Sequence, residues 1–265
     1  MSYAQVNGLN MYYEIHGSGW PLVMLHGGIS NIETDFGLVL PGLAKDRQVI
    51  AIEQQAHGRT ADIDRSLSVE QMAEDTAALL HQIGVDKADF FGYSMGAAIA
   101  LQIAIKKPDL VGKLVLAAIS YRKDGVHSGT SDSVGEVDPE MMAATQFGQA
   151  YTRLAPNPGG WPNLLKKVGE WGKNIEDWRP EDVRSVKAPV LLLFGDSDIV
   201  KPEHAVEMFR LLGGGVPGDI VGLPRSRLAI LPGTTHITLV HRADWLVSMI
   251  SDFLEAPVPD TAARA

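Results

Sequence analysis

The chain has 265 residues, 45% of them hydrophobic and 21% charged, as expected for one large α/β domain with room for a smaller insertion. Its formal net charge of −9 argues against nucleic-acid and membrane-surface partners, because an acidic surface repels phosphate groups and anionic lipid. The absence of cysteine excludes disulfides, thiolate metal sites and cysteine catalysis.

The beginning of the chain carries no targeting signal that we recognise. Residues 1–6 have neither a basic start nor a long apolar run, so we expect no signal peptide. No apolar stretch approaches about 18 residues, and we therefore expect no transmembrane helix. These features predict a cytoplasmic protein. A homodimer is compatible with the sequence.

Short apolar runs recur along the chain and predict the strands of a sheet. Residues 11–16 alternate and end at a glycine-rich turn, which predicts an edge strand. The other runs are continuously apolar, a pattern typical of strands that are covered on both faces. They occupy residues 21–25, 48–52, 89–91, 113–119, 190–194 and 228–231.

Helical patterns separate most of these runs. Ser68-Val69-Glu70-Gln71 has the form of a capping box, in which Ser68 accepts from the Gln71 N–H and the Gln71 side chain reaches back. It opens a helix that Gly84 ends. Further helices are predicted at 97–107, 204–212 and 243–254. Strands alternating with helices predict an α/β fold, with a mostly parallel sheet and helices on both faces.

One region breaks this alternation. Residues 121–188 contain no clear buried strand but hold three of the five tryptophans, and glycine and proline divide them into short pieces. We expect a helical cap over the carboxyl ends of the strands, where ligands bind in open α/β sheets. The predicted domains are therefore a core of residues 1–120 and 189–255 and a cap of residues 121–188. Residues 256–265 are expected to form a frayed tail.

The strongest motif is Gly92-Tyr93-Ser94-Met95-Gly96, which fits the pattern G-x-S-x-G. A predicted strand precedes it and a small-residue helix follows, as a nucleophile elbow requires. The residues two before and two after the serine must be small, because side chains there would collide across the turn. Ser94 is the expected nucleophile, and the alternative is an ordinary strand-to-helix turn.

A serine nucleophile needs a base, usually a histidine that a carboxylate orients. His236 follows the last predicted strand and is therefore the expected base. His127, His204 and His241 are expected to be solvated or on the surface of the cap. The loop after residues 190–194 offers Asp196 and Asp198, and we favour Asp198 because it lies farther out on the loop, with Asp196 as a turn residue.

The tetrahedral intermediate of acyl transfer also needs two donors for its oxyanion. One is expected from the backbone N–H of Met95. The glycine loop His26-Gly27-Gly28 supplies the other, with Gly28 as first choice and Ile29 as second. His26 is expected to hold this loop rather than act as a second base. His57 and Arg59 are expected to serve a turn, with substrate contact as the alternative.

Together these motifs resemble the α/β-hydrolase superfamily over nearly the whole chain, with a cap between sheet strands six and seven. The segment 193–198 resembles the family's acid loop, and residues 232–236 resemble its histidine loop. The resemblance favours Asp198 over Asp196. We expect no cofactor and no metal. The segment Glu53-Gln54-Gln55-Ala56-His57-Gly58-Arg59-Thr60 departs from the family's usual Asp-x-Arg-Gly-His-Gly-x-Ser, and residues 213–224 are longer than usual.

A serine at position 94 indicates acyl chemistry. We expect an esterase or lactonase, acting on a small ester or lactone through an acyl-enzyme. The alternatives are a C–C bond hydrolase of aromatic ring-cleavage products and a cofactor-free perhydrolase. A ligand receptor built on the same fold is the alternative that is not an enzyme.

Overall fold

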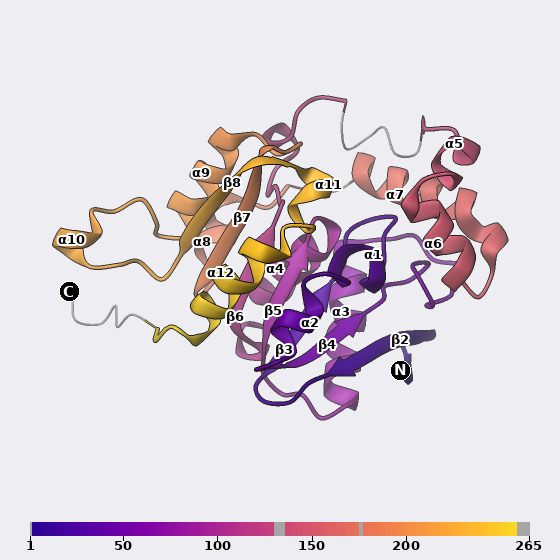
Figure 1. The fold of residues 1–265 in the computed structure, drawn as a ribbon, viewed down its shortest axis with the longest axis horizontal. Coiled ribbons are helices and arrows are strands. Elements are labelled where there is room, and N and C mark those ends of the chain that lie inside the picture. The colour runs from indigo at the N-terminus through magenta and orange to yellow at the C-terminus, as the bar shows by residue number, and fades with distance from the viewer. Residues whose placement is uncertain (1, 130–135, 175–176, 259–265) are drawn as a thin grey trace.

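A computed structural model describes residues 2–129, 136–174 and 177–258 of the chain. Its described residues form one eight-stranded sheet in the order β1-β2-β4-β3-β5-β6-β7-β8 (Figure 1). The two strands β1 and β2 pair antiparallel with their neighbours, and all other pairs are parallel. The predicted α/β class is confirmed. The strands are β1 (Ser2–Val6), β2 (Leu9–His16), β3 (Pro21–Leu25), β4 (Gln48–Ile52), β5 (Ala88–Tyr93), β6 (Val111–Ala117), β7 (Val190–Ser197) and β8 (Arg227–Thr235).

The prediction that residues 11–16 form an edge strand is wrong. Strand β2 lies between β4 and β1, and β1 is the edge. The hairpin between β1 and β2 turns at Asn7 and Gly8, whose φ angles of 48° and 86° are both left-handed. An Asn-Gly pair favours this two-residue turn, so the sequence did contain a signal for the additional strand.

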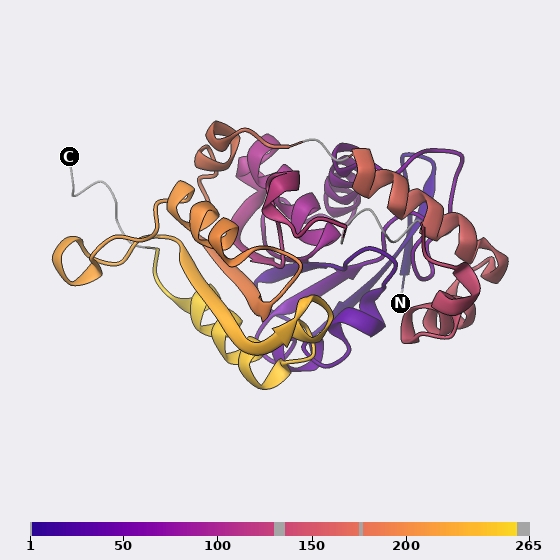
Figure 2. The same ribbon diagram turned by 90° about the horizontal axis from the view of Figure 1, so that it is seen from above.

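Helices cover both faces of the sheet because the buried strands are apolar on both sides. In β3, Val23 and Leu25 pack into the same core as α3 and α4, whereas Leu22 and Met24 pack with α2 and α12. Figure 2 shows these two layers from above, with α12 in yellow on the side opposite α3 and α4. The core helices are α1 (Ile32–Phe36), α2 (Leu40–Leu43), α3 (Val69–Gln82), α4 (Met95–Lys106), α9 (Pro202–Leu211), α10 (Gly218–Val221), α11 (His236–Leu239) and α12 (Ala243–Glu255).

The predicted capping box at the start of α3 is half right. The Ser68 hydroxyl accepts a hydrogen bond from the Gln71 N–H at 3.1 Å. The Gln71 side chain does not reach back to Ser68, and its NH2 group donates to Asp75 Oδ1 at 3.0 Å. Asp75 also accepts hydrogen bonds from Arg65 and Asn7, so Gln71 is one of three side chains that donate to this buried carboxylate.

Helices occupy the segment between β6 and β7. They are α5 (Pro139–Ala143), α6 (Gln146–Leu154), α7 (Trp161–Asn174) and α8 (Pro180–Arg184). The described part of residues 121–188 holds no strand beyond an isolated bridge between Val126 and Val200. Figure 1 shows α5, α6 and α7 grouped beyond α1. A bidentate ion pair between Arg153 of α6 and Glu33 of α1, with bonds of 2.8 and 3.1 Å, joins this group to the core.

Two segments near the C-terminal end of the chain lie outside the packed layers. The glycine-rich segment 213–224 carries α10 on an arm that projects from the body of the molecule (Figures 1 and 2). Of the predicted tail, residues 259–265 lie outside the described residues, and residues 256–258 follow the end of α12. Within the described part of the chain, no helix has the length and apolar character needed to cross a bilayer.

Candidate active site

Ser94 lies on a sharp turn between β5 and α4, with φ 52° and ψ −115°. Left-handed φ is costly for a residue with a side chain and is tolerated only where the surrounding structure enforces it. A Cβ atom at Gly92 would collide with the backbone of Gly96 and Ala97, and one at Gly96 would collide with the carbonyl of Leu25. The turn therefore requires glycine at both positions, as the sequence predicted.

Three of the predicted residues form one hydrogen-bonded chain. Ser94 Oγ lies 3.0 Å from His236 Nε2, and His236 Nδ1 lies 2.7 Å from Asp198 Oδ1. The carboxylate of Asp198 is buried, whereas the His236 side chain is 18% exposed. Asp198 also accepts the Val200 N–H at 3.2 Å. With the proton of His236 on Nδ1, Nε2 is free to accept from the serine hydroxyl.

The neighbouring Asp196 does not enter this chain. It is exposed, and its two carboxylate oxygens accept the N–H groups of Gly233 at 2.9 Å and of Thr234 at 3.2 Å. These bonds lower the pKa of Asp196 below its ordinary value. Asp196 therefore ties the loop after β7 to the end of β8, the role of a turn residue that the sequence suggested.

Of the other histidines after Ser94, one contradicts the prediction. His127 is exposed and His241 is partly buried. His204 is buried, not solvated, because it stacks on Tyr121 with ring centroids 4.7 Å apart. Its Nε2 accepts the Tyr121 N–H at 3.1 Å. Burial lowers the pKa of His204, so this ring acts as a neutral structural group.

The loop after β3, residues 26–30, approaches Ser94 from the other side. Its Gly27 N–H donates to Asp35 Oδ2 at 2.8 Å, and its Ile29 N–H donates to His57 Nε2 at 3.1 Å. Among the described residues, no hydrogen-bond acceptor is paired with the N–H of Gly28, nor with that of Met95 at the start of α4. These two amides are therefore available as donors at the site.

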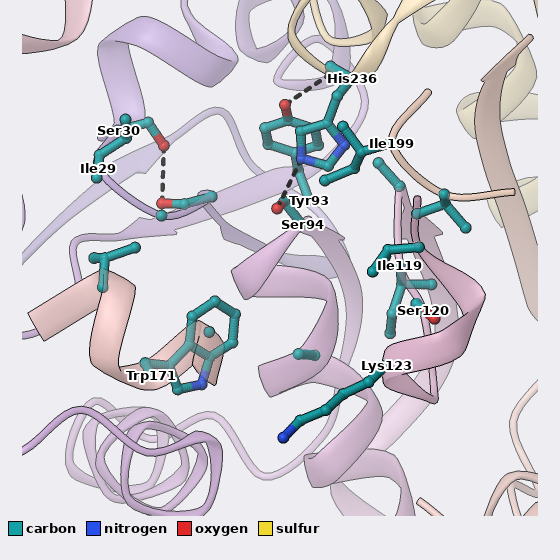
Figure 3. Close-up of a pocket in the computed structure, with 18 of the residues that line it drawn as sticks. Ile29, Ser30, Tyr93, Ser94, Ile119, Ser120, Lys123, Trp171, Ile199 and His236 are labelled. Atoms are coloured by element: carbon teal, nitrogen blue, oxygen red, sulfur yellow. Dashed lines mark hydrogen bonds between the residues drawn. The ribbon is translucent and has the colours of Figure 1, made fainter. Parts of the chain in front are cut away.

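Two residues of the site were not found from the sequence. Tyr93 Oη donates to the backbone carbonyl of His236 at 2.8 Å, and the two rings lie 5.4 Å apart (Figure 3). Asp35 is buried in α1, and Ser30 Oγ donates to it at 2.5 Å. Burial raises the pKa of Asp35 to about 6. Tyr93 occupies a variable position of the G-x-S-x-G motif and Asp35 belongs to no motif, so no pattern in the sequence assigned either residue a role at the site.

A cavity of about 350 Å³ opens above Ser94 (Figure 3). Its walls are mainly apolar, and their larger side chains are Ile119, Phe147, Val168, Trp171, Trp178 and Ile199. Phe147 belongs to α6, and Val168 and Trp171 belong to α7, so the segment between β6 and β7 forms much of the wall. Trp161 of the same helix does not line the cavity. Its indole donates to the Pro139 carbonyl at 3.1 Å and packs on Tyr151.

The polar groups of the loop after β4 lie outside the cavity. Arg59 pairs with the buried Glu53 at 3.0 Å, and neither it nor His57 contributes to the lining. Burial raises the pKa of Glu53 to about 7, even though Arg59 opposes this shift. The described residues contain no cluster of histidine, aspartate and glutamate with the arrangement of a metal site.

Comparison with known proteins shows which fold family has this architecture. The family model described as the alpha/beta hydrolase fold matches residues 21–156, a little more than half of the 265 residues. The chain belongs to the α/β-hydrolase fold family. A meta-cleavage product hydrolase from Pseudomonas fluorescens has the same fold, with a TM-score of 0.78 over 96% of this chain and 97% of that one, at 17% identity.

Two curated relatives are similar over part of their length. A putative carbamate hydrolase of Rhizobium rhizogenes is 29% identical over 45% of this chain and 47% of its own. Pyrrolizixenacetamide deacetylase of Xenorhabdus hominickii is 32% identical over 66% of this chain and 64% of its own. The match thus spans about half to two thirds of these relatives. These relatives carry the names of a hydrolase and of a deacetylase.

Proposed function

We propose that the protein cleaves a carboxylic ester or lactone through an acyl-enzyme on Ser94. The observation that carries this proposal is the chain Asp198–His236–Ser94, with its bonds of 2.7 and 3.0 Å, at the base of an apolar cavity. A hydroxyl becomes nucleophilic when a base takes its proton, and His236 Nε2 lies within reach of that proton. The residues 121–188 act as a cap in this proposal, because α6 and α7 supply the cavity wall.

In the first half of the reaction, His236 removes the proton of Ser94 as its oxygen attacks the substrate carbonyl. The Gly28 and Met95 amides bind the resulting oxyanion, since neither N–H is paired with an acceptor among the described residues. Asp198 orients the imidazole and stabilises its protonated form. His236 then protonates the leaving alcohol, and the acyl group remains on Ser94.

In the second half, His236 activates a water molecule that attacks the acyl-enzyme, and Ser94 is released with its proton restored. The apolar wall suits an uncharged acyl group of moderate size, because each buried methylene contributes about 0.8 kcal/mol. The relatives named as carbamate hydrolase and deacetylase also break a bond between a carbonyl carbon and a heteroatom, which supports acyl chemistry here.

Turnover by wild-type and Ser94→Ala protein decides the proposal. The wild-type protein is expected to release p-nitrophenol from p-nitrophenyl butyrate, to acidify solutions of acyl lactones in a pH-stat, and to bind a fluorophosphonate covalently at Ser94. The variant is expected to lose at least about 10³-fold in kcat. Wild-type rates in Ser94→Ala would refute the proposal. Tight ligand binding with no turnover would instead indicate a receptor.

A further inference from the structure

Two buried histidines link the loop after β3 and the loop after β4, each accepting a backbone N–H of the other loop. His57, in the loop after β4, accepts the Ile29 N–H at 3.1 Å. His26, in the loop after β3, accepts the Gln54 N–H at 3.1 Å. Their ring centroids lie 5.0 Å apart, and both side chains are fully buried. Each loop is therefore held by a side chain of the other.

The second nitrogen of each ring determines its tautomer. His57 Nδ1 lies 2.8 Å from the Gln55 carbonyl, and His26 Nδ1 lies 2.7 Å from the Gly27 carbonyl. A carbonyl accepts but cannot donate, so each Nδ1 carries the proton and each Nε2 presents its lone pair. A protonated His57 would instead direct a second N–H at the Ile29 N–H. Only the neutral ring can hold this loop.

Three successive backbone N–H groups of the loop after β3, those of residues 27–29, differ in whether they have a hydrogen-bond acceptor. The Gly27 N–H is taken by Asp35 and the Ile29 N–H by His57, while the N–H of Gly28 between them is left for a ligand. Ile29 has a φ of 58°, which a β-branched residue adopts only when contacts enforce it. The bond to His57 is such a contact. Without it, the peptide units on either side of Ile29 would be free to rotate.

We propose that His57 is a positioning residue for oxyanion binding. By accepting the Ile29 N–H it fixes the peptide plane of the loop, directs the Gly28 N–H into the cavity above Ser94, and removes Ile29 as a competing donor. His57 does not line the cavity and acts through Gly28. The inference rests on the proposed function, because it concerns the oxyanion of that reaction.

Two substitutions separate the two bonds of His57. In His57→Asn, the side-chain amide can still donate to the Gln55 carbonyl but is too short to reach Ile29. In His57→Gln, the side-chain oxygen lies near the position of Nε2 and can still accept the Ile29 N–H. We expect kcat/KM to fall about 10²-fold in His57→Asn, the loss typical of one displaced oxyanion donor, and to stay within about tenfold of wild type in His57→Gln.

Affinity for a tetrahedral analogue separates the proposed role of His57 from a general structural role, which would not change that affinity. Binding of an alkyl boronic acid should weaken in parallel with kcat/KM across the His57 variants, while KM changes little. His204→Asn is the matched control, because His204 is also buried and its Nε2 also accepts a backbone N–H. That variant should lose stability without a parallel loss of boronate affinity.

Amide NMR of the wild-type protein tests the same inference without relying on the folding of any variant. On boronate binding, the amide protons of Gly28 and Met95 should move downfield, and that of Ile29 should not. Equal activities of His57→Asn and His57→Gln, or a shift at Ile29 in place of Gly28, would overturn the inference. Failure of the fluorophosphonate to label wild-type Ser94 would instead refute the proposed function.

Discussion

Tyr93 and His236 are 143 positions apart in the chain, yet the phenol of the first donates to the backbone carbonyl of the second at 2.8 Å. Tyr93 immediately precedes Ser94, so the strand that presents the proposed nucleophile also holds the residue proposed as its base. Burial raises the pKa of Tyr93 well above its ordinary value, with Asp35 and Asp198 contributing, and the phenol therefore remains a donor.

Tyr93→Phe tests this relationship. The variant lacks the donor to the His236 carbonyl, and we expect it to lose about 1–2 kcal/mol of stability and roughly 3- to 10-fold in kcat. Steady-state kinetics on p-nitrophenyl butyrate and thermal unfolding measure the two effects. Tyr12→Phe is the matched control, because that buried phenol donates to Glu14 away from the site. An equal fall of kcat in both variants would contradict the positioning role of Tyr93.

Asp198 and Asp196 offer a comparison between two nearby carboxylates. Asp198→Asn replaces the acceptor of the His236 Nδ1–H by an amide that favours the wrong tautomer, and kcat should fall about 10³- to 10⁴-fold. Asp196→Asn weakens only the bonds to Gly233 and Thr234, and should cost less than about tenfold. Initial rates across a series of ester concentrations distinguish the two. A larger loss in Asp196→Asn would reverse the assignment of the acid.

Asp35 makes stability depend on pH in a direction unusual for a carboxylate. Its pKa is raised from 3.8 to about 6 by burial, so between these values the folded protein keeps a proton that the unfolded chain has released. The contribution of Asp35 is therefore largest below pH 4, and the free energy of unfolding falls as pH rises to 6. Asp35→Asn cannot ionise, so its stability relative to wild type should rise by on the order of 2–3 kcal/mol across this window.

Chemical denaturation of both proteins at pH 4, 5, 6 and 7 measures this difference. Comparison with wild type is needed because His26 and His57 act in the opposite direction. Burial lowers their pKa values to about 3 and about 4, so stability is lost as pH falls below about 6.5. If the wild-type and Asp35→Asn curves run parallel, Asp35 is not the group that titrates.

Trp171 limits the size of the acyl group in the proposed reaction. Its indole belongs to the cavity wall, and Trp171→Ala should enlarge the cavity and favour longer acyl chains. We expect the ratio of kcat/KM for hexanoate over acetate esters to rise about tenfold, the equivalent of about two buried methylene groups. Trp20→Ala is the control, because Trp20 is 50% exposed and lies outside the cavity. An unchanged ratio would show that Trp171 does not set chain length.

Most of the fold could be predicted from local patterns. Strands β3 to β8 follow from apolar runs, because strands buried on both faces need apolar residues at successive positions. The edge strand β1 was not predicted, because only Ala4 and Val6 of Ser2–Val6 are buried and the segment has no continuous apolar run. The Asn7-Gly8 turn was the signal for it. Gln71 was also assigned incorrectly, although its partner Asp75 lies four residues on, at a spacing where side chains of one helix meet.

The sequence by itself determined Ser94, Asp198 and His236 as candidates, because each follows a recognisable strand and the strained turn at Ser94 demands glycines at fixed positions. The serine at position 94 also led us to expect acyl transfer. Only the tertiary structure decided which amides are free beside Ser94, that Tyr93 holds His236, and that His57 and Asp35 hold the loop of Gly28. The contacts of Tyr93 with His236 and of His57 with Ile29 join segments 143 and 28 positions apart in the chain. No local spacing encodes a hydrogen bond that exists only when two such segments pack together.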